Sequence, residues 1–423
     1  MSREMKYSGI PWIGKVPKSW TIELIGNQVK SVDNPNINGE EDNALQFKMG
    51  TIISKSKGDS KYNPETLEGY NIVDKGVIML NGLNLSFDFI SQRVGLVKEK
   101  GVITSTYLAV KPTQSINSEY LTYLFKSYDN CKAFHGMGRG LRQTLSYGEL
   151  RKHLLIYPIL EEQQKIAEFL DKKCGEVDEM IALQEQIIEE LKAYKQSVIT
   201  EAVTKGLNPN VPMKDSGIEW IGEIPEHWRI DKVIRSFGLI GSGTTPKSTE
   251  DDNFVGNIRW IQSGDINGGI MFECKNRIAE STLKKTSALK VYNPPFIIVA
   301  MYGASVGNTS ISTIDGCVNQ ACCVLSDTHL NLDYTFNVIK TCKDYWLKKA
   351  VGGGQPNISQ DTIKSTWIPI PPTNEQQSIA DYLDKKCGEI DALIAIKQQK
   401  IESLKEYKKS IIYEYVTGKK EVE

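Results

Sequence analysis

The sequence contains the same arrangement of segments twice, and this internal repeat constrains the fold more than any other feature. SGIPWIGKVPKSW at 8–20 returns as SGIEWIGEIPEHW at 216–228, and EQQKIAEFLDKKCGEVD at 162–178 returns as EQQSIADYLDKKCGEID at 375–391. In the second pair, 13 of the 17 positions are identical, which excludes chance. A solenoid stacks at least about three short units, whereas these two copies are each about 210 residues long. The repeat therefore predicts a two-domain molecule with approximate internal two-fold symmetry.

The stretches between the matched segments, 21–150 and 229–363, hardly resemble each other. Short runs of β-branched and aromatic residues, typical of strands, lie at 70–81, 93–99 and 104–112 in the first stretch and at 259–268, 296–311 and 317–325 in the second. A helical run follows in each, 118–135, started by Ser118, and 332–351. Each stretch then passes through a glycine-rich loop, 136–146 or 351–359, into a final strand. We expect two mixed α/β domains.

A long helix follows each domain, because both copies of the EQQ segment begin a proline-free run with apolar residues at steps of three and four. Steps that average 3.5 residues are the pattern of a coiled coil, so the two helices are expected to pair with each other rather than each to pack only on its own domain. The expected seam residues are Val177, Ile181, Ile188, Leu191 and Val198 in the first helix and Ile390, Ile394, Ile401, Leu404 and Ile411 in the second.

Polar residues interrupt this seam at equivalent places, Gln184 and Lys195 in the first helix and Lys397 and Lys408 in the second. If the first helix runs from about 161 to 205, its roughly 45 residues span ~67 Å at ~1.5 Å per residue. Base pairs are ~3.4 Å apart, so the rod matches about two turns of duplex DNA. The helix pair could therefore act as a ruler between two reading domains.

Composition excludes several other classes of protein. The longest uninterrupted apolar run, 296–301, is too short to span a membrane. Residues 1–10 contain no apolar stretch of the kind that a secretory signal has, so we expect none. The eight cysteines form no CxxC pair and the four histidines are scattered, so no metal site is expected and the thiols suit a cytoplasmic protein. A net charge of −1 neither favours nor excludes DNA binding, because charge can be segregated over a surface.

The whole chain resembles the specificity (S) subunits of type I restriction-modification systems. The resemblance rests on the paired SGIxWIGxxPxxW and EQQxIAxxLDKK segments, on GSGTTPKS and IRWIQSGDI between 241 and 266, and on NPPFIIVAMYGASVGN and VNQA between 293 and 321. It implies an α+β protein, with two target recognition domains separated by two long antiparallel coiled-coil helices. The implied divisions are 1–158, the first recognition domain with its entry segment; 159–206, the central helix; 207–371, the second domain with the repeated entry segment; and 372–423, the distal helix.

The same resemblance implies the partners. Each recognition domain reads one half of a bipartite, gapped site in double-stranded DNA, and the helices bind two methyltransferase (M) subunits that methylate adenine. Two restriction (R) subunits join when the complex cleaves DNA. The chain itself is expected to be non-catalytic and to bind no cofactor, with S-adenosylmethionine, ATP and Mg belonging to the partner subunits. No membrane is expected to take part.

Two other functions remain open from the residues alone. Asn293 to Phe296 resembles the NPPY/F motif of DNA adenine methyltransferases, whose Asn and aromatic residue hold a flipped base. A stand-alone methyltransferase also needs a glycine-rich S-adenosylmethionine loop after a strand, and the glycines at 241–243 are followed by TTPKS rather than by a helix. The other alternative is a coiled-coil protein adaptor without DNA contact.

The glycine-rich loops carry the best candidates for DNA contact. Arginine can bind guanine or phosphate through two parallel hydrogen bonds, and amide side chains can read adenine. The candidates are Lys132, Arg139, Arg142, Gln143, Arg151 and Lys152 in the first half, and Lys247, Arg259, Lys348, Lys349, Gln355 and Asn357 in the second. The tryptophans of the repeated entry segments are expected to anchor each domain to a helix rather than to stack on bases.

Overall fold

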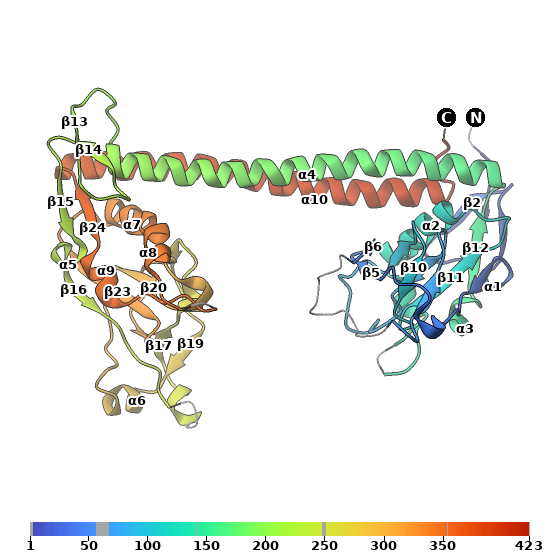
Figure 1. Ribbon diagram of the computed structural model, residues 1–423, viewed down its shortest axis with the longest axis horizontal. Coiled ribbons are helices and arrows are strands. Elements are labelled where there is room, and N and C mark those ends of the chain that lie inside the picture. Colours follow the sequence, from blue (N-terminus) through green and yellow to red (C-terminus); the bar gives the residue numbers. More distant parts are fainter. Residues whose placement is uncertain (1–2, 56–66, 142, 248–250, 353, 423) are drawn as a thin grey trace. The chain divides into compact units, whose positions relative to one another are not determined.

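The computed structural model describes residues 3–55, 67–141, 143–247, 251–352 and 354–422, and the chain divides into two compact units. Unit 1 comprises Met1–Glu185 and Gln398–Glu423, and unit 2 comprises Gln186–Lys397. Helix α4 (Leu160–Lys205) and helix α10 (Thr373–Val416) each contribute one part to unit 1 and one part to unit 2 (Figure 1). Each unit therefore contains a recognition-type α/β domain together with a segment of both long helices.

The core of unit 1 is an antiparallel four-stranded sheet in the order β4-β11-β8-β9. Its strands are β4 (Val29–Ser31), β8 (Ile78–Leu80), β9 (Val94–Leu96) and β11 (Leu108–Pro112). Helix α2 (Ser118–Asn130) packs on β9 and β11 with its apolar face. The smaller antiparallel pairs are β1 (Met5–Tyr7) with β2 (Lys15–Pro17), β3 (Thr21–Leu24) with β12 (Leu154–Tyr157), β5 (Leu45–Lys48) with β6 (Thr51–Ser54), and β7 (Asn71–Val73) with β10 (Gly101–Ile103). Short helices α1 (Ile25–Gln28) and α3 (Tyr147–Leu150) complete the unit.

Unit 2 is built around a five-stranded sheet in the order β16-β23-β20-β21-β18, antiparallel except between β21 and β18. Its strands are β16 (Phe237–Gly241), β18 (Ile270–Met271), β20 (Phe296–Ala300), β21 (Thr309–Ser312) and β23 (Cys322–Thr328). A second sheet joins β19 (Asn276–Ile278), β17 (Ile258–Ile261) and β22 (Cys317–Val318), and the pairs are β13 (Met213–Asp215) with β14 (Glu223–Pro225) and β15 (Arg229–Lys232) with β24 (Trp367–Ile370). The short helices are α5 (Val233–Ser236), α6 (Glu280–Lys285), α7 (Leu332–Thr341), α8 (Lys343–Lys349) and α9 (Gln360–Ser365).

The expected mixed α/β domains are confirmed, with two differences in the helical runs. The run 118–135 ends as an α-helix at Asn130, because Lys132 takes a left-handed conformation with φ 58°, and a 3-10 turn (Ala133–Gly136) follows. The run 332–351 divides at Cys342 into α7 and α8. Ser118 is the first helical residue, but the side chain that caps α2 is Asn117, which accepts a hydrogen bond from the Tyr120 amide at 2.7 Å.

The two long helices run antiparallel in both units, as the resemblance implies. In unit 1, Lys408 Nζ lies 2.7 Å from Asp178 Oδ2, and Phe169 packs on Tyr415 with ring centroids 4.4 Å apart. In unit 2, Lys195 Nζ lies 2.6 Å from Asp391 Oδ2. Lys195 and Lys408 thus reach from polar places of the seam to aspartates of the sister helix, so their charges are paired.

The expected seam residues divide into two groups by burial. Seven are buried and three (Ile181, Leu191 and Ile394) are half-buried. The buried members are Val177, Ile188, Val198, Ile390, Ile401, Leu404 and Ile411. Toward its ends each helix enters a domain core. Ile411 packs with α2 and the strands of unit 1, and Val198 packs with those of unit 2.

Candidate nucleic-acid interface

In unit 1, the glycine-rich loop lies against the loop that joins β8 to β9. The Leu145 amide donates to the Gly82 carbonyl at 2.9 Å, and the Leu85 amide donates to the Gln143 carbonyl at 3.1 Å. A Cβ on Gly82 would lie 2.7 Å from the Leu145 carbonyl oxygen, so this close approach requires glycine. We name the pair of segments 81–93 and 136–146 the paired loops of unit 1.

A buried arginine holds the first of these loops in shape. Arg93 is 1% exposed, and its guanidinium donates to the backbone carbonyls of Asn81 (2.9 Å), Leu83 (2.8 Å) and Asp88 (2.5 Å). Hydrogen bonds from an ionised donor to several carbonyls fix a loop more firmly than neutral ones. This role of Arg93 could not be predicted from the sequence, because the carbonyl groups that it binds belong to the backbone and are the same in every residue type.

The Asp88 carboxylate completes this loop by accepting hydrogen bonds from the amides of Ile90 (3.1 Å) and Ser91 (2.9 Å). A hydrogen bond from the Ser91 side chain, together with these amides and the nearby Arg93 charge, lowers the pKa of Asp88 to about 2. The carboxylate is therefore ionised at neutral pH and holds the turn at the tip of the loop.

Two basic candidates of the first half pair with one acidic residue. Glu149 forms ion pairs with Arg139 (Nε to Oε2, 3.1 Å) and with Lys152 (Nζ to Oε1, 3.1 Å). Arg151 follows in the chain and lies over the ring of Tyr147, 5.9 Å from its centroid. The Arg139 side chain is 75% exposed, so it reaches solvent despite its ion pair.

The remaining candidates of this half differ in their setting. Gln143 has a left-handed backbone with φ 45°, and its carbonyl accepts the hydrogen bond from the Leu85 amide that joins the paired loops. Lys132 is half-buried at the start of the 3-10 turn that leads into the glycine-rich loop. Arg142 lies outside the described residues.

Unit 2 has the same arrangement at the equivalent place. The loop between β20 and β21 pairs with the second glycine-rich loop, because the Gly303 amide donates to the Pro356 carbonyl and the Ile358 amide to the Met301 carbonyl, both at 3.0 Å. Gln355 and Asn357 are exposed on this second loop. The structure therefore brings both amide candidates to one surface. We name the segments 301–308 and 351–359 the paired loops of unit 2.

The basic candidates of unit 2 are more dispersed. Lys348 and Lys349 lie in the last turn of α8, directly before the glycine-rich loop, and Lys349 lies over the Tyr345 ring, 4.5 Å from its centroid. Lys247 is exposed on the segment between β16 and β17, and its backbone carbonyl accepts a hydrogen bond from the Asn253 side-chain amide at 3.2 Å.

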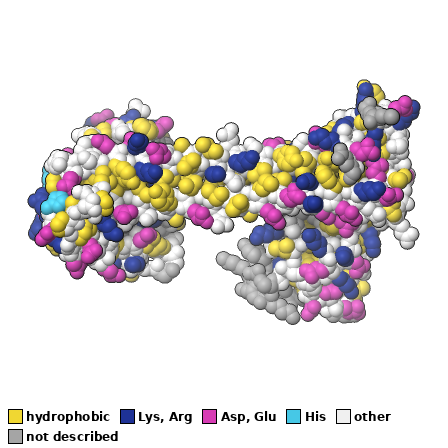
Figure 2. Space-filling model, turned by 90° about the horizontal axis from the view of Figure 1, so that it is seen from above, with side chains coloured by type: hydrophobic (Ala, Val, Ile, Leu, Met, Phe, Trp, Pro, Cys, Tyr) yellow, Lys and Arg dark blue, Asp and Glu magenta, His cyan; other side chains and the backbone are white. Residues whose placement is uncertain are grey.

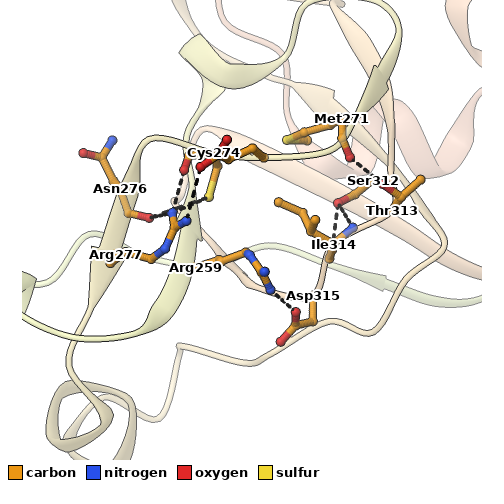
Figure 3. A network of polar contacts seen from close by, with 10 residues as sticks. Arg259, Met271, Cys274, Asn276, Arg277, Ser312, Thr313, Ile314 and Asp315 are labelled. Carbon is orange, nitrogen blue, oxygen red and sulfur yellow. Dashed lines mark hydrogen bonds and ion pairs between the residues drawn. The ribbon is translucent and has the colours of Figure 1, made fainter.

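Arg259 belongs to a different part of unit 2, the β19-β17-β22 sheet. Its guanidinium forms an ion pair with Asp315, and the neighbouring Arg277 donates to the Cys274 carbonyl at 2.5 Å (Figure 3). Both arginines thus have structural partners within the sheet. The charge of Arg259 is thus already matched by the Asp315 carboxylate.

The NPPF segment serves as a packing element. Phe296 is fully buried at the start of β20, and every residue of that strand is buried. A ring that holds a flipped base must be accessible to that base. The motif therefore lacks the exposed aromatic side chain that the methyltransferase interpretation requires.

Trp20 and Trp228 of the entry segments anchor domains to helices, as expected of these tryptophans. Trp20 and Trp228 are each 1% exposed. The Trp20 indole N–H donates to Glu162 of α4 at 3.3 Å, and that of Trp228 donates to Glu375 of α10 at 2.9 Å. Each long helix therefore begins with a carboxylate that binds a tryptophan of the entry segment.

Large apolar side chains are also exposed along the long helices. They repeat at equivalent positions of the two copies: Met180 with Leu393, Leu183 with Ile396, and Tyr194 with Tyr407, each 46–59% exposed. Figure 2 shows hydrophobic side chains gathered along these helices. Exposed apolar surface of this extent, repeated by the internal symmetry, is typical of a protein interface.

The comparisons with known proteins agree on one family. The type I restriction modification DNA specificity domain matches residues 94–193 and 225–406, more than half of the chain. Over 430 aligned positions the chain is 25% identical to the putative type I restriction enzyme MjaX specificity subunit of Methanocaldococcus jannaschii, covering 96% of this chain and 95% of the relative. The MjaVIII specificity subunit of the same organism is 23% identical and covers 96% and 94%.

Solved structures agree in fold. One from a study of complex assembly and conformational transition of the type I R-M system has a TM-score of 0.69 at 16% identity, covering 95% of this chain and 99% of that one. The HsdS subunit from Thermoanaerobacter tengcongensis has a TM-score of 0.52 at 17% identity, covering 95% and 98%.

The chain therefore belongs to the type I restriction modification DNA specificity domain family. It is a specificity subunit, the component of such a system that recognises DNA and is not itself the catalyst. Among the described residues, no helix is both long and apolar enough to cross a membrane.

Proposed function

We propose that this specificity subunit reads a bipartite, gapped site in double-stranded DNA, with one half-site read by each recognition domain. The single observation that carries the proposal is the duplication: two unlike domains, each with paired loops at the same place, on one pair of sister helices. Because the two domains differ in sequence, the two half-sites differ as well.

The paired loops are the surface assigned to base reading. In unit 1, Arg139, Arg142 and Gln143 are the candidates for base contact, and Lys132, Arg151 and Lys152 those for phosphate contact. In unit 2, Gln355 and Asn357 would read bases, and Lys348, Lys349 and Lys247 would bind phosphate. Arg259 is the weakest candidate, since Asp315 already matches its charge.

The helices carry the partner surface in this proposal. As a specificity subunit the chain acts with methyltransferase subunits, and two of them would dock on equivalent exposed apolar residues of the two units. These are Met180, Leu183 and Tyr407 in unit 1 and Leu393, Ile396 and Tyr194 in unit 2. Two restriction subunits would join for cleavage. S-adenosylmethionine, ATP and Mg would then be held by these partners, in the cytoplasm.

The decisive experiment maps N6-methyladenine at base resolution in cells with and without this gene, together with its methyltransferase partner. We expect one bipartite motif, methylated in both halves, that disappears with the gene. Methylation that is unchanged by the deletion would contradict the proposed function. A gel shift with DNA that carries the motif then tests whether the chain binds DNA, with and without the methyltransferase subunit. A protein adaptor without DNA contact would shift no DNA in either case.

The ruler function of the helices has its own test. Insertion of one heptad at matching places in α4 and α10 keeps the seam in register and lengthens each helix by ~10.5 Å. We expect the gap of the methylated motif to widen while both half-sites stay the same. Altered half-sites with an unaltered gap would contradict the ruler.

A further inference from the structure

The paired loops of unit 1 expose several large apolar side chains, and three of them are more than 70% exposed. Phe87 is 75% exposed, Ile90 is 87% exposed and Leu141 is 100% exposed. Ser86 Oγ donates to the Leu141 carbonyl at 3.4 Å, which links the two loop tips next to these residues. Exposed apolar residues scattered singly need no explanation, whereas three on two joined loops form a patch. We name Phe87, Ile90 and Leu141 the apolar patch.

The loop that presents Phe87 and Ile90 is rigidly built. The amides of Phe87 and Asp88 both donate to the Asn84 carbonyl at 3.1 Å, and His135 Nε2 lies 3.0 Å from the Asp88 carbonyl. Phe89 stacks on the His135 ring with centroids 4.7 Å apart. Phe89 is 55% exposed, but its ring is held against His135, which fixes the loop tip that carries Phe87 and Ile90. A fixed apolar surface loses little entropy on binding, which is the property of a recognition element.

The chemistry beside the patch identifies its ligand class. Leu141 lies between Arg139 and Gln143, which supply hydrogen-bond donors from the same loop. In the major groove, thymine presents a 5-methyl group beside the O4 acceptor, and it is the one base that combines an apolar group with an acceptor there. An apolar patch with adjacent donors complements this edge.

We infer that the apolar patch reads thymine 5-methyl groups in the half-site recognised by unit 1. The inference rests on the proposed function, which places the paired loops on DNA, and adds a specificity determinant that hydrogen-bonding residues do not supply. The equivalent loops of unit 2 expose Tyr302 (42%) and Val351 (77%) instead. The two domains therefore differ in their apolar contact as well as in their polar residues.

The test uses the full chain in complex with its methyltransferase subunits and duplexes that carry the motif found by methylation mapping. Each thymine of the first half-site is replaced in turn by deoxyuridine, which removes only the methyl group. With the wild-type complex we expect one or two positions at which this exchange weakens binding about three- to five-fold, the effect of one apolar carbon. Fluorescence anisotropy at constant salt measures the Kd.

The variants Phe87→Ala, Ile90→Ala and Leu141→Ala identify which side chain contacts the thymine methyl group. At least one of them should weaken binding to the thymine duplex by a similar factor and lose the response to deoxyuridine. Ile37→Ala, which truncates a 65% exposed apolar residue of the same unit, is the matched control and should keep the response. All four side chains are exposed, so thermal melting should match the wild type.

The outcomes separate this inference from the proposed function. If the wild-type complex does not distinguish the motif from a scrambled duplex, the proposed function fails. If it binds the motif specifically but responds to no deoxyuridine in that half-site, or if all three variants respond as the wild type does, the inference is overturned. A rise in 2-aminopurine fluorescence that depends on Phe87 would also overturn it, because that signal reports insertion between bases rather than groove contact.

Discussion

Arg3 and Glu421, which are 418 residues apart in the chain, form an ion pair with Nη2 and Oε1 at 2.7 Å. The same guanidinium donates to Glu162 at 2.6 Å, the carboxylate that also accepts the Trp20 indole N–H. Unit 1 thus joins the two ends of the chain without a covalent bond, whereas in unit 2 the peptide 206–213 joins the equivalent elements.

Arg3→Ala should lower the stability of unit 1 by a small amount that high salt abolishes. The Arg3 side chain is 26% exposed, so the pairs are screened by solvent and by ions. Thermal melting at low salt and in 1 M NaCl measures the effect. Lys18→Ala, which removes a more exposed pair with Glu4, is the control and should change nothing at either salt concentration.

Tyr120→Phe and Tyr334→Phe should each lower the free energy of unfolding of the unit that contains it by about 0.5–1.5 kcal/mol. The buried Tyr120 hydroxyl lies 3.3 Å from the Ile156 carbonyl and 3.1 Å from that of Val416, so it joins α2 to a strand and to the end of α10. Tyr334 makes the equivalent contacts in unit 2 with Pro369 (3.0 Å) and Val203 (3.4 Å). Denaturant titration provides the measurement. Tyr407→Phe, at an exposed position, should be neutral, and equal losses for all three would refute the argument.

Reversal of one charge in a cross-helix pair should destabilise the coiled coil, and reversal of both should restore it. Lys195→Asp places two carboxylates together, and the double variant Lys195→Asp/Asp391→Lys recreates the pair in the opposite sense. The expected coupling is about 0.2–1 kcal/mol, since Asp391 is more than half exposed. A double-mutant cycle on chemical unfolding measures it. Two single effects that simply add would show that the pair is not coupled.

Arg139→Ala should reduce the slope of log K against log salt for DNA binding by about 0.9, and the double variant with Arg142→Ala by about twice that. Glu149→Gln should act in the opposite direction, because it frees Arg139 and Lys152 from their shared carboxylate. Binding titrations at several salt concentrations distinguish these effects. An unchanged slope in both arginine variants would remove these residues from the interface.

The contribution of Asp88 should depend on pH in the acid range. Its folded-state pKa of about 2 lies below the ordinary value of 3.8, so its ionised form stabilises the loop above pH ~4, and this stabilisation is lost as the pH falls toward 2. We expect wild type to melt at a higher temperature than Asp88→Asn at pH 6, with the difference shrinking as the pH falls below 4. A difference that is constant with pH would show that ionisation plays no part.

Much of the fold could be predicted, because the internal repeat and the regular spacing of apolar residues in the long helices encode it. Val177 and Ile390 occupy the same seam position in two nearly identical segments, and both are buried. The paired loops could not be predicted, because amide-to-carbonyl hydrogen bonds such as that from Leu85 to Gln143 depend on no particular side chain. The division of the helical run at Lys132 was also hidden, since buried apolar residues such as Phe134 continue beyond it.

The interleaving of the two units has a consequence for synthesis on the ribosome. The core of unit 1 includes Ile411, Ile412 and Val416, which follow all residues of unit 2 in the chain and are therefore translated after them. The first domain to emerge therefore cannot complete its core until the second has been made. The apolar side of α4 that packs in unit 1 stays uncovered during that interval. The nascent chain is therefore expected to need chaperones until α10 folds back onto α4.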